Sequence, residues 1–342
     1  MKTIIFCAGA SIPFFDPQLT TNYLTKVISD KNKWQSSIDR FTLNRENILL
    51  PSSDEIIETI EIIKQINSEY NFEQITEIID KIASWSFDNI PKNNMLNAYI
   101  GTLIRCKKLV SCNNFQNWQH IPFILRMIIA ETILELEQNN KSKNYSELIK
   151  TQHEFIESYS ESDKVSIVSF NYDDILLRSI ENLGFEKGFN KLDLRGRRLD
   201  VKALNFASKS IYFPHGHLRF NFLDDENVEY YSDPQDAHEA RWDNSNSIYS
   251  PLSITRGKFA YNFNTFITTG QTKDDSFNLM PYSFYYQKLA TDLLNSTEIV
   301  LIGYSFGDEH LNRLLISFLA ISPANKVLIV DYYQNNLSLT EE

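Results

Sequence analysis

Glycine and proline are scarce in this sequence, with ten of each among 342 residues. Chains without stable structure are enriched in such residues and poor in aromatic ones. Here the reverse holds, because the chain carries 23 phenylalanines and 17 tyrosines, and 42% of its residues are hydrophobic. The composition therefore argues against a disordered chain and favours a packed, largely helical protein.

Cysteine and long hydrophobic runs are also lacking. The three cysteines, Cys7, Cys106 and Cys112, have neither the spacing of a metal site nor that of a disulfide framework. No segment approaches the roughly 20 apolar residues that span a bilayer. The apolar run after Met1 is too brief for a signal peptide. We therefore expect no bound metal, no membrane association and a cytoplasmic location.

Positive charge is in deficit, with 33 basic against 44 acidic residues and a net charge of −11. Such a surface repels phosphate backbones, and no basic run stands out, so nucleic acid is excluded as a primary partner. A negatively charged ligand such as a dinucleotide would have to be held by backbone N–H groups and helix N-termini.

The strands that the sequence predicts lie toward its two ends. Buried strands are expected at residues 3–7, 165–170, 211–214, 298–303 and 326–331, with a further β-rich piece at 259–269. Helices are expected at 19–28, 175–183, 282–294 and 308–319. Strands that alternate with helices in this way predict an α/β fold with a doubly wound, Rossmann-like parallel sheet.

Between these ends, residues 53–159 read as helical throughout. Ile56, Ile60 and Ile63 recur at the three-to-four spacing of a helix face, and residues 121–136 form another amphipathic run. We therefore predict a large helical insertion at 53–159. It divides a nucleotide-binding domain formed by residues 1–52 and 160–334, and a polar tail follows at 335–342.

The first candidate site residues follow the first predicted strand. Ala8, Gly9, Ala10 and Ser11 are small, so the backbone could approach a pyrophosphate whose charge is stabilised by N–H groups. A turn of small residues between a strand and a helix is also common for purely structural reasons.

The second group follows the strand at 165–170. Ligands of open α/β sheets bind at the carboxyl ends of the strands. Asn171 could there orient a ribose hydroxyl or a water, and Asp173 could accept a hydrogen bond from an amide. The alternative is that these residues only cap the next helix, which is the interpretation that we favour for Asp174.

The third group is His215, Gly216 and His217, after the strand at 211–214. Histidine is the natural general base near neutral pH, and glycine allows a sharp turn beside a ligand. The alternatives are a loop histidine bonded to a backbone carbonyl, or a metal site. No set of carboxylates and histidines at ligand spacing accompanies the pair, so the metal is less favoured.

The fourth group is Gly303, Tyr304, Ser305 and Asp308, between the strand at 298–303 and a helix. Gly303 and Ser305 could contact phosphate or ribose, while Asp308 could simply cap the helix. The segment also matches the Gly-x-Ser-x-Gly elbow of α/β-hydrolases, which needs an acid and a histidine downstream. His310 is the sole later histidine and lies directly after the elbow, so this alternative is poor.

The order of these motifs resembles the sirtuin family. Ala-Gly-Ala-Ser, Asn-Tyr-Asp, His-Gly, Gly-Tyr-Ser-Phe-Gly-Asp and a last strand ending in Asp331 follow one another along the chain. The sequence is more closely similar to the sirtuin-like NAD-hydrolysing domains of bacterial antiphage defence systems. The resemblance covers both ends of the chain and residues 165–216, and it implies a sirtuin-type sheet.

The resemblance also implies roles for single residues. Asn171 and Asp173 would position the nicotinamide ribose and carboxamide, and His215 would be the catalytic histidine. The dinucleotide would contact Ala8, Gly9, Ala10, Ser11, Gly303, Tyr304, Ser305 and Asp308, with Asp331 at the adenosine ribose.

Three departures from the family pattern limit this carry-over. Cys7 replaces the first glycine of the usual turn, and Thr20 stands where deacylating sirtuins usually carry arginine. The two Cys-x-x-Cys pairs of the structural zinc module are missing, so peptide deacylation loses its scaffold.

The resemblance finally implies a function. NAD would be the substrate, its nicotinamide–ribose bond would be hydrolysed, and NAD would be depleted when an antiphage trigger arrives. Restraint of that activity implies a homo-oligomer or a regulatory or sensor protein partner. Whether the product is ADP-ribose or a cyclised form stays open. The alternatives are a catalytically silent nucleotide-sensing or scaffold subunit and, less favoured, a protein deacylase.

Overall fold

A computed structural model of the chain describes residues 1–43, 48, 50–85, 118, 120–161, 164–189, 191–193, 196–222, 228–243, 266–269 and 280–331. Cys106, Cys112, most of the β-rich piece expected at 259–269, and the tail at 335–342 lie outside these residues. The chain divides into two compact units. Unit 1 comprises Met1–Thr20, Leu136–His217 and Pro281–Glu342, and unit 2 comprises Thr21–Glu135 and Leu218–Met280.

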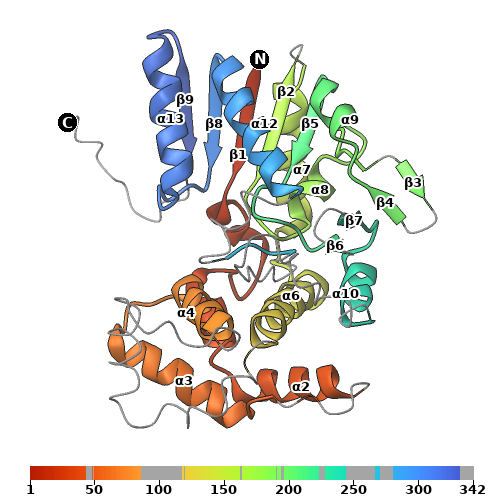
Figure 1. Cartoon of the computed structure of the whole chain (residues 1–342). Helices are drawn as coiled ribbons and strands as arrows, with labels where there is room; N and C mark the ends of the chain where they lie inside the picture. The colour runs from red at the N-terminus through yellow and green to blue at the C-terminus, as the bar shows by residue number, and fades with distance from the viewer. Residues whose placement is uncertain are drawn as a thin grey trace, which may run out of the picture. The chain divides into compact units, whose positions relative to one another are not determined.

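Unit 1 contains a five-stranded, all-parallel sheet flanked by helices, which confirms the predicted Rossmann-like α/β fold (Figure 1). Its strands are β1 (Lys2–Phe6), β2 (Val165–Ser169), β5 (Lys209–Tyr212), β8 (Glu298–Ile302) and β9 (Lys326–Val330). Their order in the sheet is β5-β2-β1-β8-β9. The chain winds from the centre toward β5 and then restarts on the other side of β1, so the winding reverses between β1 and β8.

The central strands are short apolar runs because both of their faces are covered. All five residues of β2 are buried, and Ile4 of β1 lies opposite Ile167 on one side and Val300 on the other. The edge strand β9 differs, since Leu328, Ile329 and Val330 are exposed. The hydrophobic core of the sheet is therefore centred on β2, β1 and β8.

Unit 1 has five complete helices among its described residues. They are α7 (Tyr145–Tyr159), α8 (Ile175–Ser179), α9 (Val201–Phe206), α12 (Tyr282–Asn295) and α13 (Glu309–Ile321), with short 3-10 turns η1 (Ala8–Ala10) and η2 (Ile12–Phe14) after β1. Of these, α8, α12 and α13 correspond to helices predicted after or between the strands, and α7 belongs to the segment predicted as a helical insertion. Figure 1 shows α12 and α13 near β8 and β9, and α7, α8 and α9 near β2 and β5. Unit 1 also holds an antiparallel pair, β3 (Lys191–Asp193) and β4 (Gly196–Arg198).

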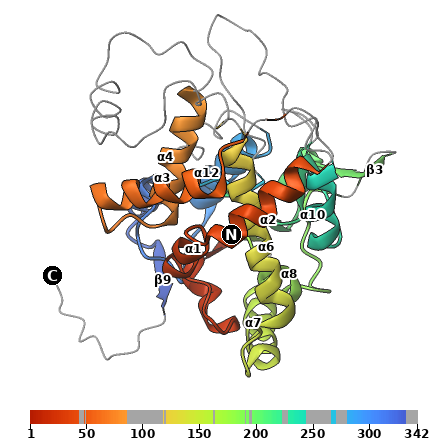
Figure 2. The ribbon, with the colours of Figure 1, turned by 90° about the horizontal axis from the view of Figure 1, so that it is seen from below.

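Unit 2 is mostly helical. Its helices are α1 (Thr21–Val27), α2 (Lys31–Thr42), α3 (Ser53–Ile66), α4 (Phe72–Trp85), most of α6 (Ile121–Asn139) and α10 (Pro234–Asp243), beside an antiparallel pair of β6 (Phe220–Phe222) and β7 (Val228–Tyr230). Figure 2 shows α3 and α4 side by side. Helix α3 begins with a capping box in which Ser52 and Glu55 bond each other's backbone N–H groups.

Several elements differ from the expectation. The helix predicted at 175–183 ends at Ser179, because Asn182 and Gly184 adopt left-handed φ angles of 66° and 76° that a helix cannot contain. The short elements β3, β4, β6, β7 and α9, and helix α10, are not predicted. Strands of three residues are too short to show an alternating pattern. Within the described parts of the chain, no helix is long and apolar enough to cross a membrane.

Candidate functional site

The candidate residues of unit 1 meet at the carboxyl ends of the parallel strands. Ser11 follows β1, Asn171 follows β2, His215 follows β5, and Asp308 follows β8. Side-chain contacts link Ser11 with Asn171, and His215 with Asp308. The sheet therefore brings into contact residues that lie 160 positions apart in the first pair and 93 in the second (308 − 215).

Asn171 is held in one orientation at this edge. Its backbone N–H donates to Ser169 Oγ at 3.2 Å, and its side-chain Nδ2 donates to Ser11 Oγ at 2.7 Å. The side chain is buried, and its Oδ1 has no hydrogen-bond partner among the described residues. Because Ser11 fixes the amide nitrogen, the opposite end of the amide is left as a hydrogen-bond acceptor.

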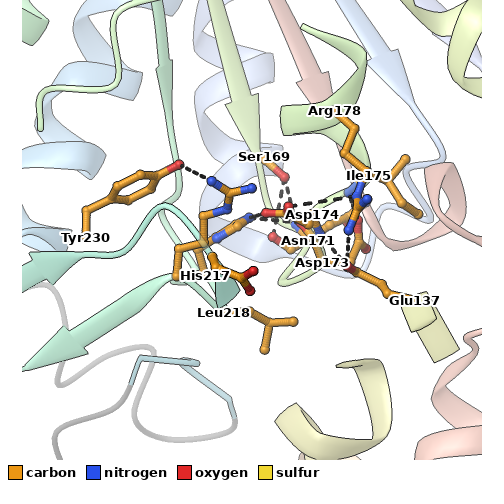
Figure 3. A network of polar contacts seen from close by, with 12 residues as sticks. Glu137, Ser169, Asn171, Asp173, Asp174, Ile175, Arg178, His217, Leu218 and Tyr230 are labelled. Carbon is orange, nitrogen blue, oxygen red and sulfur yellow. Dashed lines mark hydrogen bonds and ion pairs between the residues drawn. The ribbon is translucent and has the colours of Figure 1, made fainter. Parts of the chain in front are cut away.

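Asp173 explains why Ser11 can accept a hydrogen bond from Asn171. The Ser11 hydroxyl donates its proton to Asp173 Oδ2 at 2.6 Å, so its oxygen is left to accept (the loop is shown in Figure 3). Asp173 Oδ1 accepts from the backbone N–H of Ile175 at 3.2 Å. Burial raises the pKa of Asp173 from 3.8 to about 6, although these two hydrogen bonds oppose the rise. Both carboxylate oxygens therefore serve the loop itself.

The hydrogen bond from Ile175 N–H to Asp173 Oδ1 shows that the prediction of Asp174 as the capping side chain of α8 is wrong. Asp174 does occupy the N-cap position of α8, but its side chain makes no capping hydrogen bond. The bond to the first turn comes from Asp173 instead. The Asp174 side chain is buried, and its Oδ2 lies 3.9 Å from Arg178 Nε.

His215 is buried at the end of β5, against Phe170. Their rings meet edge to face with centroids 4.6 Å apart, and Gly216 beside it adopts a φ of 89° that favours glycine. Asp308 Oδ2 lies 3.3 Å from His215 Nε2. A carboxylate at that position stabilises the protonated imidazole, so the pair has the composition of a general base with an orienting acid.

His217 has a different environment from His215. It is fully buried, and its Nε2 lies 2.9 Å from the backbone oxygen of Asp173, to which it donates. The alternative of a histidine bonded to a backbone carbonyl thus applies to His217. Its contact holds the Asn171–Asp173 loop from the side of β5.

Three backbone N–H groups in the turn of small residues donate hydrogen bonds to backbone oxygens of the protein itself. Gly9 N–H donates to Gly303 O at 3.0 Å, Ala10 N–H to Cys7 O at 2.8 Å, and Ser11 N–H to Ala8 O at 3.2 Å. A Cβ on Gly303, whose φ is +66°, would lie 2.1 Å from the nitrogen of Ala10. These glycines therefore let the ends of β1 and β8 pack backbone to backbone, and a phosphate role for the turn stays a prediction.

Of the candidate residues after β8, some are buried and others are exposed to solvent. Tyr304 is buried, and its single hydroxyl proton lies between two acceptors, Asp308 O at 2.9 Å and Asn312 Oδ1 at 2.7 Å, while Ser305 is exposed. Asp308 caps α13 by accepting from Leu311 N–H at 3.0 Å, which confirms the capping interpretation. Asp331 is exposed directly after β9. Their contacts with a dinucleotide stay predictions.

Cys7, which stands where the family has glycine, is buried at the end of β1. Burial, with a smaller contribution from the Asp308 carboxylate, raises the pKa of its thiol. Only the thiolate is a nucleophile, so the burial of Cys7 disfavours a nucleophilic role for it.

Two charged residues close to the site were not predicted. Glu137 Oε1 accepts from Asp174 N–H at 2.7 Å, and Arg178 Nη2 lies 3.2 Å from Glu137 Oε2 (Figure 3). In the sequence, Glu137 is one of several glutamates near the end of a helix and looks like an ordinary surface residue. Only the fold reveals that this position is buried.

Among the residues described, no group of three or more His, Cys, Asp or Glu side chains is arranged to hold a metal ion. A scan of the sequence against protein-family models gave no match, and a search of the curated proteins gave none either. The function is therefore argued from the geometry of this sheet edge and from the resemblance in its motifs.

Proposed function

We propose that the chain is an NAD glycohydrolase with a sirtuin-like nucleotide-binding domain, which cleaves the bond between nicotinamide and ribose at the carboxyl edge of the sheet. One observation carries the proposal. Asn171 Oδ1 is buried without a partner among the described residues, while Nδ2 is fixed by Ser11. An unsatisfied buried acceptor costs about 1–3 kcal/mol. We therefore expect a ligand hydroxyl or a water to donate to this oxygen.

The residues around Asn171 suit this reaction. Water adds to C1′ of the ribose as the bond to nicotinamide breaks, and nicotinamide, ADP-ribose and one proton are released. Asn171 Oδ1 would accept from the attacking water or a ribose hydroxyl, and His215 would accept the released proton. Asp308, 3.3 Å from His215 Nε2, would stabilise the resulting imidazolium.

Asp173 takes a different part in this proposal from the one that the resemblance implies. Both of its oxygens accept hydrogen bonds from the protein itself, one from Ser11 after β1 and one from Ile175 at the start of α8. We therefore assign it to the orientation of Asn171 through Ser11 rather than to the nicotinamide carboxamide.

The biological setting rests on the resemblance alone. We propose an antiphage effector that depletes NAD when triggered and that is otherwise restrained by self-assembly or by a partner protein.

Nicotinamide release from NAD by the purified chain tests the activity. We expect Asn171→Ala and His215→Ala each to lower kcat by at least about 100-fold, the range for removal of a general base or an orienting group. The control is Asn295→Ala, at the exposed end of α12, where the side chain bonds only to Thr291 O in its own helix. Turnover unchanged in either site variant would contradict the assignment.

Ligand binding separates the main alternative. ADP-ribose should raise the melting temperature of the wild type, because a ligand that binds only the folded state stabilises it. Binding without turnover in the wild type would favour a silent nucleotide-sensing subunit. If the wild type neither binds ADP-ribose nor releases nicotinamide from NAD, both functions are excluded.

A further inference from the structure

Three carboxylates are buried together beside the Asn171 loop. Glu137, Asp173 and Asp174 are 3%, 4% and 2% exposed, and they come from the end of α6 and the loop before α8. Figure 3 shows them converging with Arg178 and His217. Nothing in the proposed reaction so far uses Glu137 or Asp174.

Glu137 holds the backbone of this loop. Its Oε1 accepts from the N–H of Asp174 at 2.7 Å, and its Oε2 lies 3.2 Å from Arg178 Nη2. His217 holds the preceding residue from the other side, through the backbone oxygen of Asp173 at 2.9 Å. The Asp173–Asp174 peptide is therefore fixed on two sides by buried side chains.

That peptide sets the orientation of Asn171. The Asp173 carboxylate accepts from Ser11, and Ser11 accepts from Asn171 Nδ2. A shift of Asp173 would release the Ser11 hydroxyl and with it the Asn171 amide. Glu137 thus acts on Asn171 indirectly, through the Asp173–Asp174 peptide and Ser11. None of the hydrogen bonds described joins Glu137 to Asn171 directly.

Among the contacts described for this group, carboxylates outnumber cations. If all three carboxylates are ionised, Arg178 is the cation that contacts Glu137, and its side chain is 40% exposed. The other titratable groups around Glu137 are Tyr145 on α7, whose pKa is raised to about 12 by burial, and His217, 3.9 Å from Asp174 Oδ1. Like charges in a buried group favour retention of a proton.

Burial and repulsion from Asp174 and Asp173 accordingly raise the pKa of Glu137 from 4.5 to about 8. Hydrogen bonding from the Asp174 N–H and the charge of Arg178 oppose the rise. Near neutral pH the group as a whole therefore retains a proton, which it loses in mildly alkaline solution.

We propose that Glu137 is a positioning residue for Asn171, and that the proton shared by Glu137, Asp173 and Asp174 keeps the Asn171 loop in its working position. The role in catalysis rests on the proposed NAD hydrolysis. The shared proton itself does not, so the two can be tested apart.

The first experiment measures the shared proton without any activity. The free energy of unfolding of the wild type and of Glu137→Gln is compared from pH 5 to pH 9. Glutamine has the same shape, keeps an acceptor for Asp174 N–H and does not titrate. The folded state of the wild type holds the proton more tightly than the unfolded chain does. The contribution of Glu137 to stability is therefore complete below pH 4.5 and lost as the pH rises through about 8.

We therefore expect the folding equilibrium constant of the wild type, relative to Glu137→Gln, to fall by up to about tenfold per pH unit between these limits. The matched control is Glu154→Gln on the exposed surface of α7, where the side chain is 61% exposed and should leave the pH dependence unchanged. Equal pH dependence in the wild type and Glu137→Gln would overturn the shared proton.

The second experiment measures the effect on catalysis. In the wild type, kcat for nicotinamide release should fall above pH 8 while KM changes little. Glu137→Gln should keep kcat within several-fold at pH 7 and lose this alkaline fall. Arg178→Gln removes a cation that lowers the pKa of Glu137, so it should move the fall to higher pH. It also provides the test if Glu137→Gln does not fold.

The outcomes are distinguishable. Identical alkaline profiles in the wild type and both variants would overturn the positioning role. If the wild type releases no nicotinamide at any pH, the proposed function fails. The comparison of unfolding free energies then still decides whether the three carboxylates share a proton.

Discussion

Both units bury charged side chains, but they balance them differently. In unit 2, Arg126 and Asp80 form a one-to-one pair with two parallel hydrogen bonds of 2.9 and 2.8 Å, and Arg126 also donates to the backbone oxygens of Pro122 and Ile267. In unit 1, three buried carboxylates meet the partly exposed Arg178. The two charges of a balanced pair compensate each other, whereas like charges in a buried group favour retention of a proton.

The balance of buried charges is therefore more informative than their number. Arg126 has a carboxylate and two carbonyls as partners, so its burial needs no functional explanation. The carboxylates of unit 1 lie directly beside Asn171, whose Oδ1 is one of the buried polar atoms without a hydrogen-bond partner among the described residues. An imbalance of charge and an unsatisfied polar atom in the same loop distinguish a candidate site from a structural ion pair.

The largest change in stability is expected when one charge of the buried pair in unit 2 is removed. Asp80→Ala leaves Arg126 as a buried charge without its carboxylate, and we expect a loss of about 4 kcal/mol in the free energy of unfolding. Urea denaturation measures it. The double variant Asp80→Leu, Arg126→Met removes both charges and should be destabilised less. A loss below about 1 kcal/mol for Asp80→Ala would mean that the pair does not support the fold.

The glycine packing of unit 1 gives the next effect. Gly303→Ala places a Cβ 2.1 Å from Ala10 N at a φ of +66°, so we expect a loss of about 3 kcal/mol. Gly184→Ala is the matched control. Its φ is +76°, but nothing lies within 4 Å of the added Cβ, so only the left-handed strain of about 1 kcal/mol remains. Equal losses in the two variants would show that the close approach of β1 and β8 does not matter.

Unit 1 also contains a buried pair with one charge of each sign, which can be compared with the three carboxylates. Lys288 and Asp292 form a buried ion pair on α12, and Tyr212 donates to Asp292 Oδ2 at 3.0 Å. Tyr212→Phe removes that donor and should lower the free energy of unfolding by about 2 kcal/mol. Urea denaturation measures the loss. A loss below about 0.5 kcal/mol would mean that the Tyr212 hydrogen bond does not support this pair.

The smallest effect is expected at the surface. Arg313 and Glu309 pair on α13 at 3.0 Å, but their side chains are 74% and 80% exposed. Glu309→Ala should change stability by less than about 0.5 kcal/mol, since water and salt screen such pairs. A larger loss, seen by thermal denaturation at two salt concentrations, would mean that exposure is a poor guide to the value of a charge pair here.

Much of the sheet could be predicted from the sequence, because parallel strands that are buried on both faces are short, continuous apolar runs. The segments that became β1, β2, β8 and β9 show this pattern directly. Short elements such as β6 and β7 could not be predicted, since three residues carry no periodicity. Their position depends on contacts with distant parts of the chain.

Site residues could be predicted only where a polar side chain directly follows a predicted strand. Asn171 and His215 could be singled out because polar residues after apolar strands lie at the ligand-binding edge. Glu137 could not, since it lies on a helix and its burial depends on how that helix meets the loop before α8. The roles of Ser11 and Asp173 in orienting Asn171 likewise follow from distances that no local pattern encodes.

The backbone contact of Gly9 with Gly303 has a consequence for how this protein can change over evolutionary time. Each glycine fills the space that a side chain on the other would need, since a Cβ on Gly9 would lie 2.8 Å from Gly303 Cα. Neither position can gain a larger residue while its counterpart compensates, because glycine has nothing left to remove. We therefore expect descendants of this gene to inherit both glycines together, whatever ligand the neighbouring loops come to recognise.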